Sequence, residues 1–177
     1  MKYLCVFCGS SEGTKKSYTA SAQELGHMMA DKNWGLVYGG ASIGVMGAVA
    51  NGVLEKKGKV LGVIPESIAK LEVAHNHLTQ LEVVDSMHER KERMYELSDA
   101  FVAIPGGMGT LDELCEIVTW AQLKFHDKPI YVLNQEGFFD HLLNHFRHIH
   151  DQGFLKKEHL DLVREVKTNE ELLAALK

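Results

Sequence analysis

Short apolar runs alternate with segments of helical periodicity along the whole chain. The apolar runs are rich in Val, Ile and Leu, and they lie at 2–8, 34–40, 59–65, 81–85, 100–107 and 128–134. Continuous apolar runs of this length are typical of strands in a parallel sheet that is covered on both faces. Apolar residues recur at helical spacing between them, in segments 17–33, 44–58, 87–98, 111–125 and 141–150. The tail from residue 162 predicts one more strand and a helix.

This alternation predicts one domain over residues 1–177. The fold class is α/β, a Rossmann-like doubly wound three-layer α/β/α sandwich with a mainly parallel sheet. Residues 66–79 fit neither pattern and are predicted to be irregular. Ligands of such folds bind at the carboxyl ends of the strands, so the loops at that edge are where functional residues are expected.

Composition excludes several classes of protein. The chain has 177 residues, 45% of them hydrophobic and 24% charged, as in an ordinary globular domain. A net charge of -5 argues against a nucleic-acid partner. No segment approaches the ~18 apolar residues of a membrane span, and the N-terminal run is interpreted as a first strand rather than a signal. An odd number of cysteines argues against a secreted disulfide framework, so a cytoplasmic location is expected.

Glycine-rich loops follow three of the predicted strands. They begin at Gly9-Ser10, at Gly39-Gly40 and at Gly106, and the second and third lead directly into predicted helices. Glycine lets a ligand approach the backbone, and free amide groups at a helix start favour anions. Together the loops predict a cradle for a phosphorylated small molecule. Neither a Walker motif nor a G-x-G-x-x-G occurs, which disfavours a kinase, an ATPase or an ordinary NAD enzyme.

Thr110 and Glu113 have two interpretations. Thr-x-x-Glu is the pattern of a capping box, in which the glutamate side chain reaches back to the N-cap amide. The same carboxylate would also lie at the mouth of the anion-binding loop, facing a bound ligand. The pattern alone does not choose between a cap and a functional group.

Arg90 is the second unusual charge. Met87, Met94 and Leu97 define one apolar face of the segment 87–98, and Arg90 falls within it with Lys91 on its flank. An arginine on an inner face is usually paired or faces a ligand, because an unpaired buried charge is costly. The alternative is a surface helix whose arginine stem extends outward to water.

The chain's cysteine and histidine patterns do not indicate a metal site. Cys5 and Cys8 lie three residues apart, so on a strand they point to opposite faces. His141, His145 and His148 share one side of a helix without an H-E-x-x-H pattern, and they are expected to face water. We expect no metal.

Two motifs resemble the paired signature of the Lonely Guy family, M-H-x-R-K with P-G-G-x-G-T-x-x-E. They are "SMHERKERM" at 86–94 and "PGGMGTLDE" at 105–113, and similar segments extend across nearly the whole chain. Members of this family are cytokinin-activating phosphoribohydrolases that were long labelled possible lysine decarboxylases. The resemblance implies hydrolysis of the N-glycosidic bond of a nucleoside 5'-monophosphate, without a cofactor, by a homodimer.

The resemblance also implies roles for individual residues. Arg90 and Glu113 match the family's catalytic positions. Positions associated with substrate binding match Glu72, Lys91, Gly106, Gly107, Met108, Gly109, Thr110, Leu111 and Asp112. Many members have glutamate where this chain has Asp112, but Glu113 stays in register. The decarboxylase label is not supported by these residues, because a pyridoxal enzyme needs a Schiff-base lysine and a partner for the pyridine nitrogen.

These residues suggest a mechanism. Breaking the bond from C1' to the base builds positive charge on the ribose, which the carboxylate of Glu113 would stabilise. The same group would accept a proton from the attacking water. Arg90 would stabilise either the departing base or the phosphate, and sequence does not decide which. The alternative function is a non-catalytic nucleotide carrier or sensor, which would need the loops but not this pair.

Overall fold

Seven parallel strands form one sheet in the order β4-β3-β2-β1-β5-β6-β7 in the computed structural model of the chain, which describes residues 1–69 and 74–176. The strands are β1 (Lys2–Phe7), β2 (Trp34–Tyr38), β3 (Val60–Pro65), β4 (Gln80–Val84), β5 (Ala100–Ala103), β6 (Ile130–Leu133) and β7 (Val163–Val166). The predicted parallel sheet is therefore confirmed.

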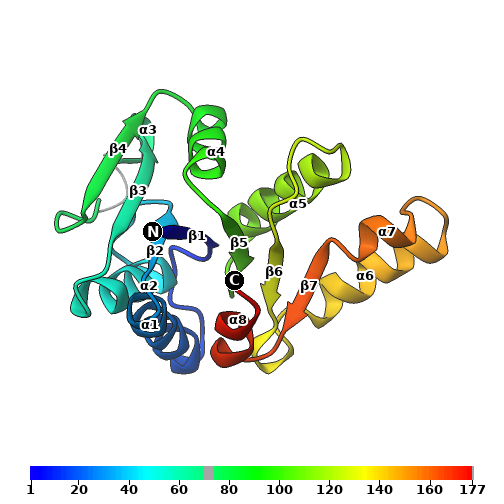
Figure 1. Cartoon of the computed structure of the whole chain (residues 1–177), viewed down its shortest axis with the longest axis horizontal. Helices are drawn as coiled ribbons and strands as arrows, with labels where there is room; N and C mark the ends of the chain where they lie inside the picture. Colours follow the sequence, from blue (N-terminus) through cyan, green and yellow to red (C-terminus); the bar gives the residue numbers. More distant parts are fainter. Residues whose placement is uncertain (70–73, 177) are drawn as a thin grey trace.

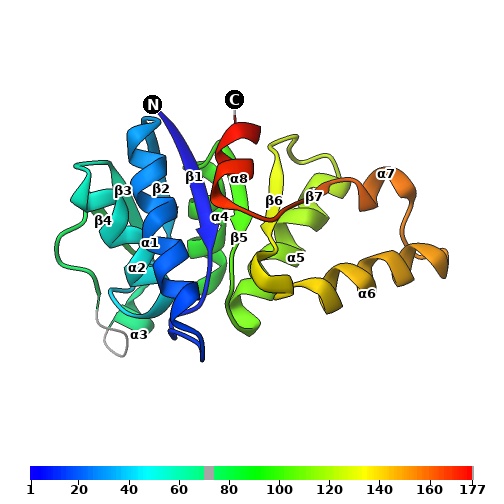
Figure 2. The same cartoon turned by 90° about the horizontal axis from the view of Figure 1, so that it is seen from below.

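Helices cover both faces of this sheet (Figures 1 and 2). One face carries α1 (Lys16–Asp31), α2 (Gly44–Glu55) and α8 (Asn169–Ala175), which share one hydrophobic core with the strands. The other carries α4 (Met87–Glu96), α5 (Met108–Gln122) and α6 (Asp140–Asp151), which share a second core. The short elements are α3 (Glu66–Ala69), the 3-10 turn η1 (Gln135–Gly137) and α7 (Lys157–Leu160). This is the predicted doubly wound three-layer sandwich.

Strand β1 illustrates why the strands are apolar at every position. Leu4 and Val6 belong to the core under α1 and α2, whereas Cys5 and Phe7 belong to the core under α4 and α5. Successive side chains of a strand point to opposite faces, so a strand covered on both sides has no polar alternation. Cys8 lies on the face opposite to Cys5, as the sequence predicted.

The strand order creates a crevice beside β1. This strand pairs with β2 on one side and with β5 on the other. The chain leaves β1 toward α1 on one face of the sheet and leaves β5 toward α5 on the other. The two loops therefore diverge at the carboxyl edge, which is where open α/β sheets bind ligands.

The structure differs from the sequence-based prediction in two segments. Helix α5 begins at Met108 rather than at Leu111, because Gly107 has the extended backbone of an N-cap and the glycine-rich residues after it are already helical. The segment predicted to be irregular contains the one-turn helix α3 and a bridge from Ala74 to Ala41. None of the helices in the described ranges has both the length and the apolar character needed to cross a membrane.

Candidate active site

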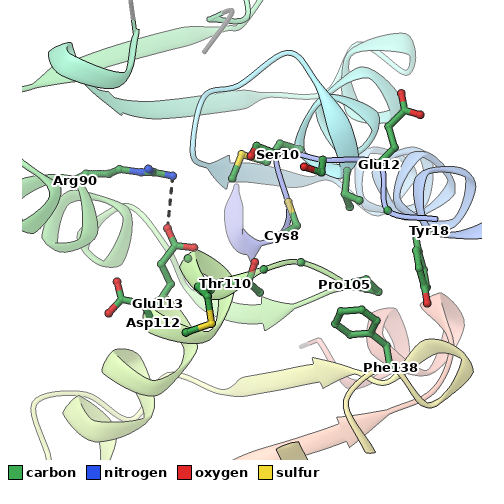
Figure 3. Close-up of a pocket in the computed structure, with 18 of the residues that line it drawn as sticks. Cys8, Ser10, Glu12, Tyr18, Arg90, Pro105, Thr110, Asp112, Glu113 and Phe138 are labelled. Carbon is green, nitrogen blue, oxygen red and sulfur yellow. Dashed lines mark ion pairs between the residues drawn. The ribbon is translucent and has the colours of Figure 1, made fainter. Parts of the chain in front are cut away.

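A cavity of about 450 Å³ lies in the crevice between the loops that follow β1 and β5 (Figure 3). Cavities of this size are typical of small-molecule sites. Its walls come from the loop after β1, the starts of α1 and α2, the inner face of α4, the loop into α5 and the turn before α6. The lining residues are Cys8, Ser10, Ser11, Glu12, Gly13, Tyr18, Val45, Met46, Met87, Arg90, Pro105, Gly106, Gly107, Met108, Gly109, Thr110, Asp112, Glu113 and Phe138.

The start of α5 offers free hydrogen-bond donors to this cavity. The first amide groups of a helix have no acceptor within it, and Gly107, the N-cap residue of this helix, has no side chain that could cap it. The hydroxyl of Thr110 is buried and has no hydrogen-bond partner in the described part of the chain. A Cβ atom at Gly106 would lie 2.1 Å from that hydroxyl, so only glycine fits there. Amide groups, a helix dipole and a buried hydroxyl together favour an anion.

This geometry excludes the capping-box interpretation of Glu113. Thr110 is the third residue of α5, and the N-cap is Gly107. A capping box would require Thr110 to be the N-cap residue itself. The carboxylate of Glu113 therefore lies within the helix and lines the cavity.

The glycine loop before α2 differs from the loop before α5. The amide groups of Val45 and Met46, at the start of α2, donate to the carbonyls of Ser11 and Gly9 at 3.3 Å and 3.1 Å. A Cβ atom at Gly44 would lie 2.3 Å from the backbone of Ser10. These donors are used within the protein, so this loop supports the loop after β1 instead of offering its own amides to a ligand.

Gly39 and Gly40, predicted as substrate-binding residues, do not line the cavity. A Cβ atom at Gly39 would lie 2.1 Å from Nη2 of Arg90, so the glycine leaves room for the guanidinium. Gly40 has a φ of 82°, and its carbonyl accepts a hydrogen bond from the amide of His75 at 3.1 Å. Gly39 thus shapes the wall behind the arginine, whereas Gly40 lies against Ile64 and Leu81.

Arg90 and Glu113 form a buried ion pair at one end of the cavity (Figure 3). Nη2 of Arg90 lies 3.5 Å from Oε1 of Glu113, and the two residues are only 5% and 6% exposed. Nε of Arg90 has no partner among the described residues, and Nη1 contacts only the sulfur of Met87, at 3.7 Å. Arg90 therefore faces inward, as its place on the apolar face predicted, and has donors left over for a ligand.

Burial raises the pKa of Glu113 to about 7. Removing a carboxylate from water disfavours its charged form, and the negative charge of Asp112 acts in the same direction. The positive charge of Arg90 opposes this rise, and Lys91 opposes it more weakly. A carboxyl group that titrates near neutrality can hold or release a proton under physiological conditions.

Lys91 does not line the cavity but holds its wall in place. Its ammonium group lies 3.0 Å from the carboxylate of Glu116 and 3.3 Å from that of Asp112. These contacts join α4, which carries Arg90, to α5, which carries Glu113.

The remaining predicted site residues occupy different places. Ser10, Met108 and Asp112 line the cavity, and Met108 is 80% exposed at its mouth. Gly9 does not line the cavity, and its amide group donates a hydrogen bond to the carbonyl of Pro105 at 3.2 Å. Leu111 packs against the core under α5. Glu72 lies outside the described residues.

Two aromatic residues of the cavity were missed by the sequence analysis. Tyr18 of α1 and Phe138, after η1, meet edge to face with ring centroids 5.6 Å apart. They line the end of the cavity opposite to Arg90 (Figure 3). The two residues are far apart in sequence and neither lies in a recognisable motif, so no local signal could have joined them.

The histidines of α6 lie outside the cavity. His141, His145 and His148 are exposed, as the apolar residues on the other side of the helix predicted. Within residues 1–69 and 74–176, no group of three or more His, Cys, Asp or Glu residues is arranged to hold a metal ion.

Known proteins are similar to this chain over most of its length. A protein-family model described as possible lysine decarboxylase matches residues 46–176. Cytokinin riboside 5'-monophosphate phosphoribohydrolase LOG3 of Arabidopsis thaliana is 42% identical, over 98% of this chain and 80% of its own length. The enzyme LOG of Oryza sativa subsp. japonica is also 42% identical, over 98% of this chain and 72% of its own length.

Solved structures with this fold include carriers of a cofactor. The molybdenum cofactor carrier protein of Chlamydomonas reinhardtii aligns with a TM-score of 0.74 at 23% identity, covering 99% of this chain and 95% of its own. The molybdenum cofactor binding protein of Rippkaea orientalis aligns with a TM-score of 0.74 at 21% identity, covering 98% and 93%. At these identities the likeness concerns the fold alone.

The near-neutral titration of Glu113 is directly testable. We expect its carboxyl carbon to titrate with a pKa of about 7 in a 13C NMR experiment, in which the signal missing from the Glu113→Gln spectrum identifies it. Asp112→Asn should lower this pKa, because a negative charge is removed, and Lys91→Met should raise it, because a positive charge is removed. An ordinary carboxyl titration that neither variant moves would contradict the described electrostatics.

Proposed function

Because this chain belongs to the Lonely Guy family, whose curated members are named cytokinin riboside 5'-monophosphate phosphoribohydrolases, we propose that it hydrolyses AMP or an N6-substituted AMP at the N-glycosidic bond. The products are the free base and ribose 5-phosphate. The chain is thus a nucleoside 5'-monophosphate phosphoribohydrolase. The observation that carries the proposal is the buried Arg90–Glu113 pair beside the open start of α5.

The 5'-phosphate is proposed to bind at the start of α5. The amide groups there have no acceptor within the helix, and the Thr110 hydroxyl adds a buried donor. Glu113 lies one turn further along the same helix. Fixing the phosphate at the helix start therefore positions the ribose near the carboxylate.

Glu113 is proposed to act on C1'. Its ionised form stabilises the positive charge that develops on the ribose ring as the bond to the base breaks. It then accepts the proton of the water molecule that attacks C1', and passing that proton on to the departing base gives the neutral free base and restores the carboxylate. A pKa of about 7 suits this role, because the group is readily ionised yet basic enough to take a proton.

Arg90 is proposed to face the base side of the nucleotide. In Figure 3 it lies beyond Glu113, on the side away from Pro105 and the glycine loop that follows it. A phosphate at the start of α5 and a ribose at Glu113 place the base nearest to the guanidinium. Its permanent positive charge would stabilise the electrons that the departing base takes from the bond.

The lysine decarboxylase description does not fit this cavity. No lysine stands among the described residues that line it, and pyridoxal chemistry needs a lysine for the Schiff base. A non-catalytic carrier would have no use for a buried Arg90–Glu113 pair, which is costly to keep out of water. Hydrolysis uses both residues.

A homodimer is proposed as the working assembly. An apolar groove between α5, α6 and α7 is lined by Val118, Phe146, Ile149, Leu155 and Leu160, among others. Helices α6 and α7 extend beyond the sheet at its β7 edge (Figures 1 and 2). Apolar surface of this kind is typical of an interface, and a second copy would cover it.

The proposed location is the cytoplasm. Cys5, Cys8 and Cys115 are free thiols, which persist in reducing compartments. A nucleic-acid partner is not proposed, because a net charge of -5 disfavours binding to a phosphate backbone.

The phosphate is expected to be essential for turnover. We predict that AMP, or an N6-substituted AMP, is cleaved, and that the corresponding nucleoside is nearly inert. The reason is that a nucleoside has no 5'-phosphate to bind the amide groups at the start of α5, so its C1' is not positioned against Glu113. Chromatography of released base measures both rates, and comparable turnover of adenosine and AMP would refute the phosphate site.

The role of Glu113 is tested by Glu113→Gln, which keeps its shape and removes its charge. We expect kcat for AMP to fall at least ~100-fold, with AMP binding and the melting temperature close to those of the wild type. Glu92→Gln is the control, because Glu92 is an exposed carboxylate on α4 that does not line the cavity. Equal losses in both variants, or no loss in Glu113→Gln, would rule out a catalytic carboxylate at this position.

A further inference from the structure

The end of the cavity occupied by Tyr18 and Phe138 has no part in the mechanism above. Both rings line the cavity, and Phe138 is 38% exposed despite being a large apolar side chain. In Figure 3 they lie with Pro105 on one side of Thr110, and Arg90 and Glu113 lie on the other side. The start of α5 therefore lies between the end of the cavity that holds the Arg90–Glu113 pair and an aromatic end, where Glu12 also lines the cavity.

The turn that carries Phe138 is held in a conformation that its sequence does not favour. Glu136 has a φ of 52°, which is rare for a residue other than glycine and costs on the order of 1–3 kcal/mol. Several contacts hold the turn. Glu136 pairs with the ammonium of Lys15 at 2.6 Å, and Asn134 accepts the amide hydrogen of Phe139 at 2.8 Å. These contacts hold the turn that carries Phe138, and the ring itself packs against Tyr18.

The proposed function sets the direction of a bound nucleotide, and the inference that follows rests on it. With the phosphate at the start of α5 and the ribose at Glu113, the base points toward Arg90. The aromatic end then lies on the side of the phosphate that faces away from the ribose. Only a group attached to the phosphate itself can reach it.

We propose that the aromatic end is a second subsite, for an aromatic group esterified to the 5'-phosphate of the nucleotide. Ligands of this class include dinucleotides, in which a second base is joined through phosphate. The ring of such a ligand would pack against Phe138 and Tyr18, which already form an aromatic wall. A phosphodiester keeps one negative charge, so the amide groups of α5 still bind it.

The test compares AMP with its phenyl ester by calorimetry, in protein carrying Glu113→Gln so that neither ligand is consumed. We expect the ester to bind about tenfold more tightly than AMP, the scale of one aromatic stacking contact. Adding Phe138→Ala should abolish this preference, and Phe138→Leu should weaken it. Phe154→Ala is the matched control, because Phe154 is 85% exposed and does not line the cavity.

Weaker binding of the ester than of AMP would overturn the subsite, because the aromatic end would then be closed. The same preference with and without Phe138→Ala would also overturn it. Both readouts are ratios of two dissociation constants in one protein, so a general loss of affinity does not affect them. Turnover of AMP by the wild type is measured separately, and its absence would contradict the proposed hydrolysis rather than the subsite.

Discussion

The site depends on keeping the Arg90–Glu113 pair out of water. Two buried charges 3.5 Å apart attract each other, but the loss of hydration opposes their burial. In Glu113 this loss raises the pKa of the carboxyl group. The fold meets this constraint by close packing: only glycine at position 39 leaves room for the guanidinium, and Lys91 ties α4 to α5. The result is a carboxyl group with a pKa of about 7 and a guanidinium whose Nε has no partner among the described residues.

The three glycine-rich loops have different structural roles. The loop before α5 gives this helix a start whose amide groups favour an anion, whereas two amides at the start of α2 are bonded to the backbone of the loop after β1. That support fixes the loop after β1 against the cavity. A phosphate bound at α5 would then meet a rigid surface, and rigidity is what converts phosphate binding into exact placement of C1'.

Much of this follows from sequence. Apolar runs covered on both faces predicted the sheet, and the position of Arg90 on an apolar helical face predicted its burial. The use of the α2 amides and the start of α5 at Met108 were not predictable, because both depend on how separate loops pack. The pairing of Tyr18 with Phe138 depends on tertiary structure alone, and the pKa of Glu113 on burial that no spacing reveals.

A crystal structure of the Glu113→Gln protein with AMP bound would show directly how the nucleotide lies in the cavity. We predict that the phosphate lies at the start of α5, within hydrogen-bonding distance of the Thr110 hydroxyl. We also expect C1' within about 4 Å of the side chain at position 113, the separation of groups poised to react, and the base on the side of Arg90. A nucleotide bound in the opposite direction, with its phosphate on Arg90 and its base against Phe138, would contradict this prediction.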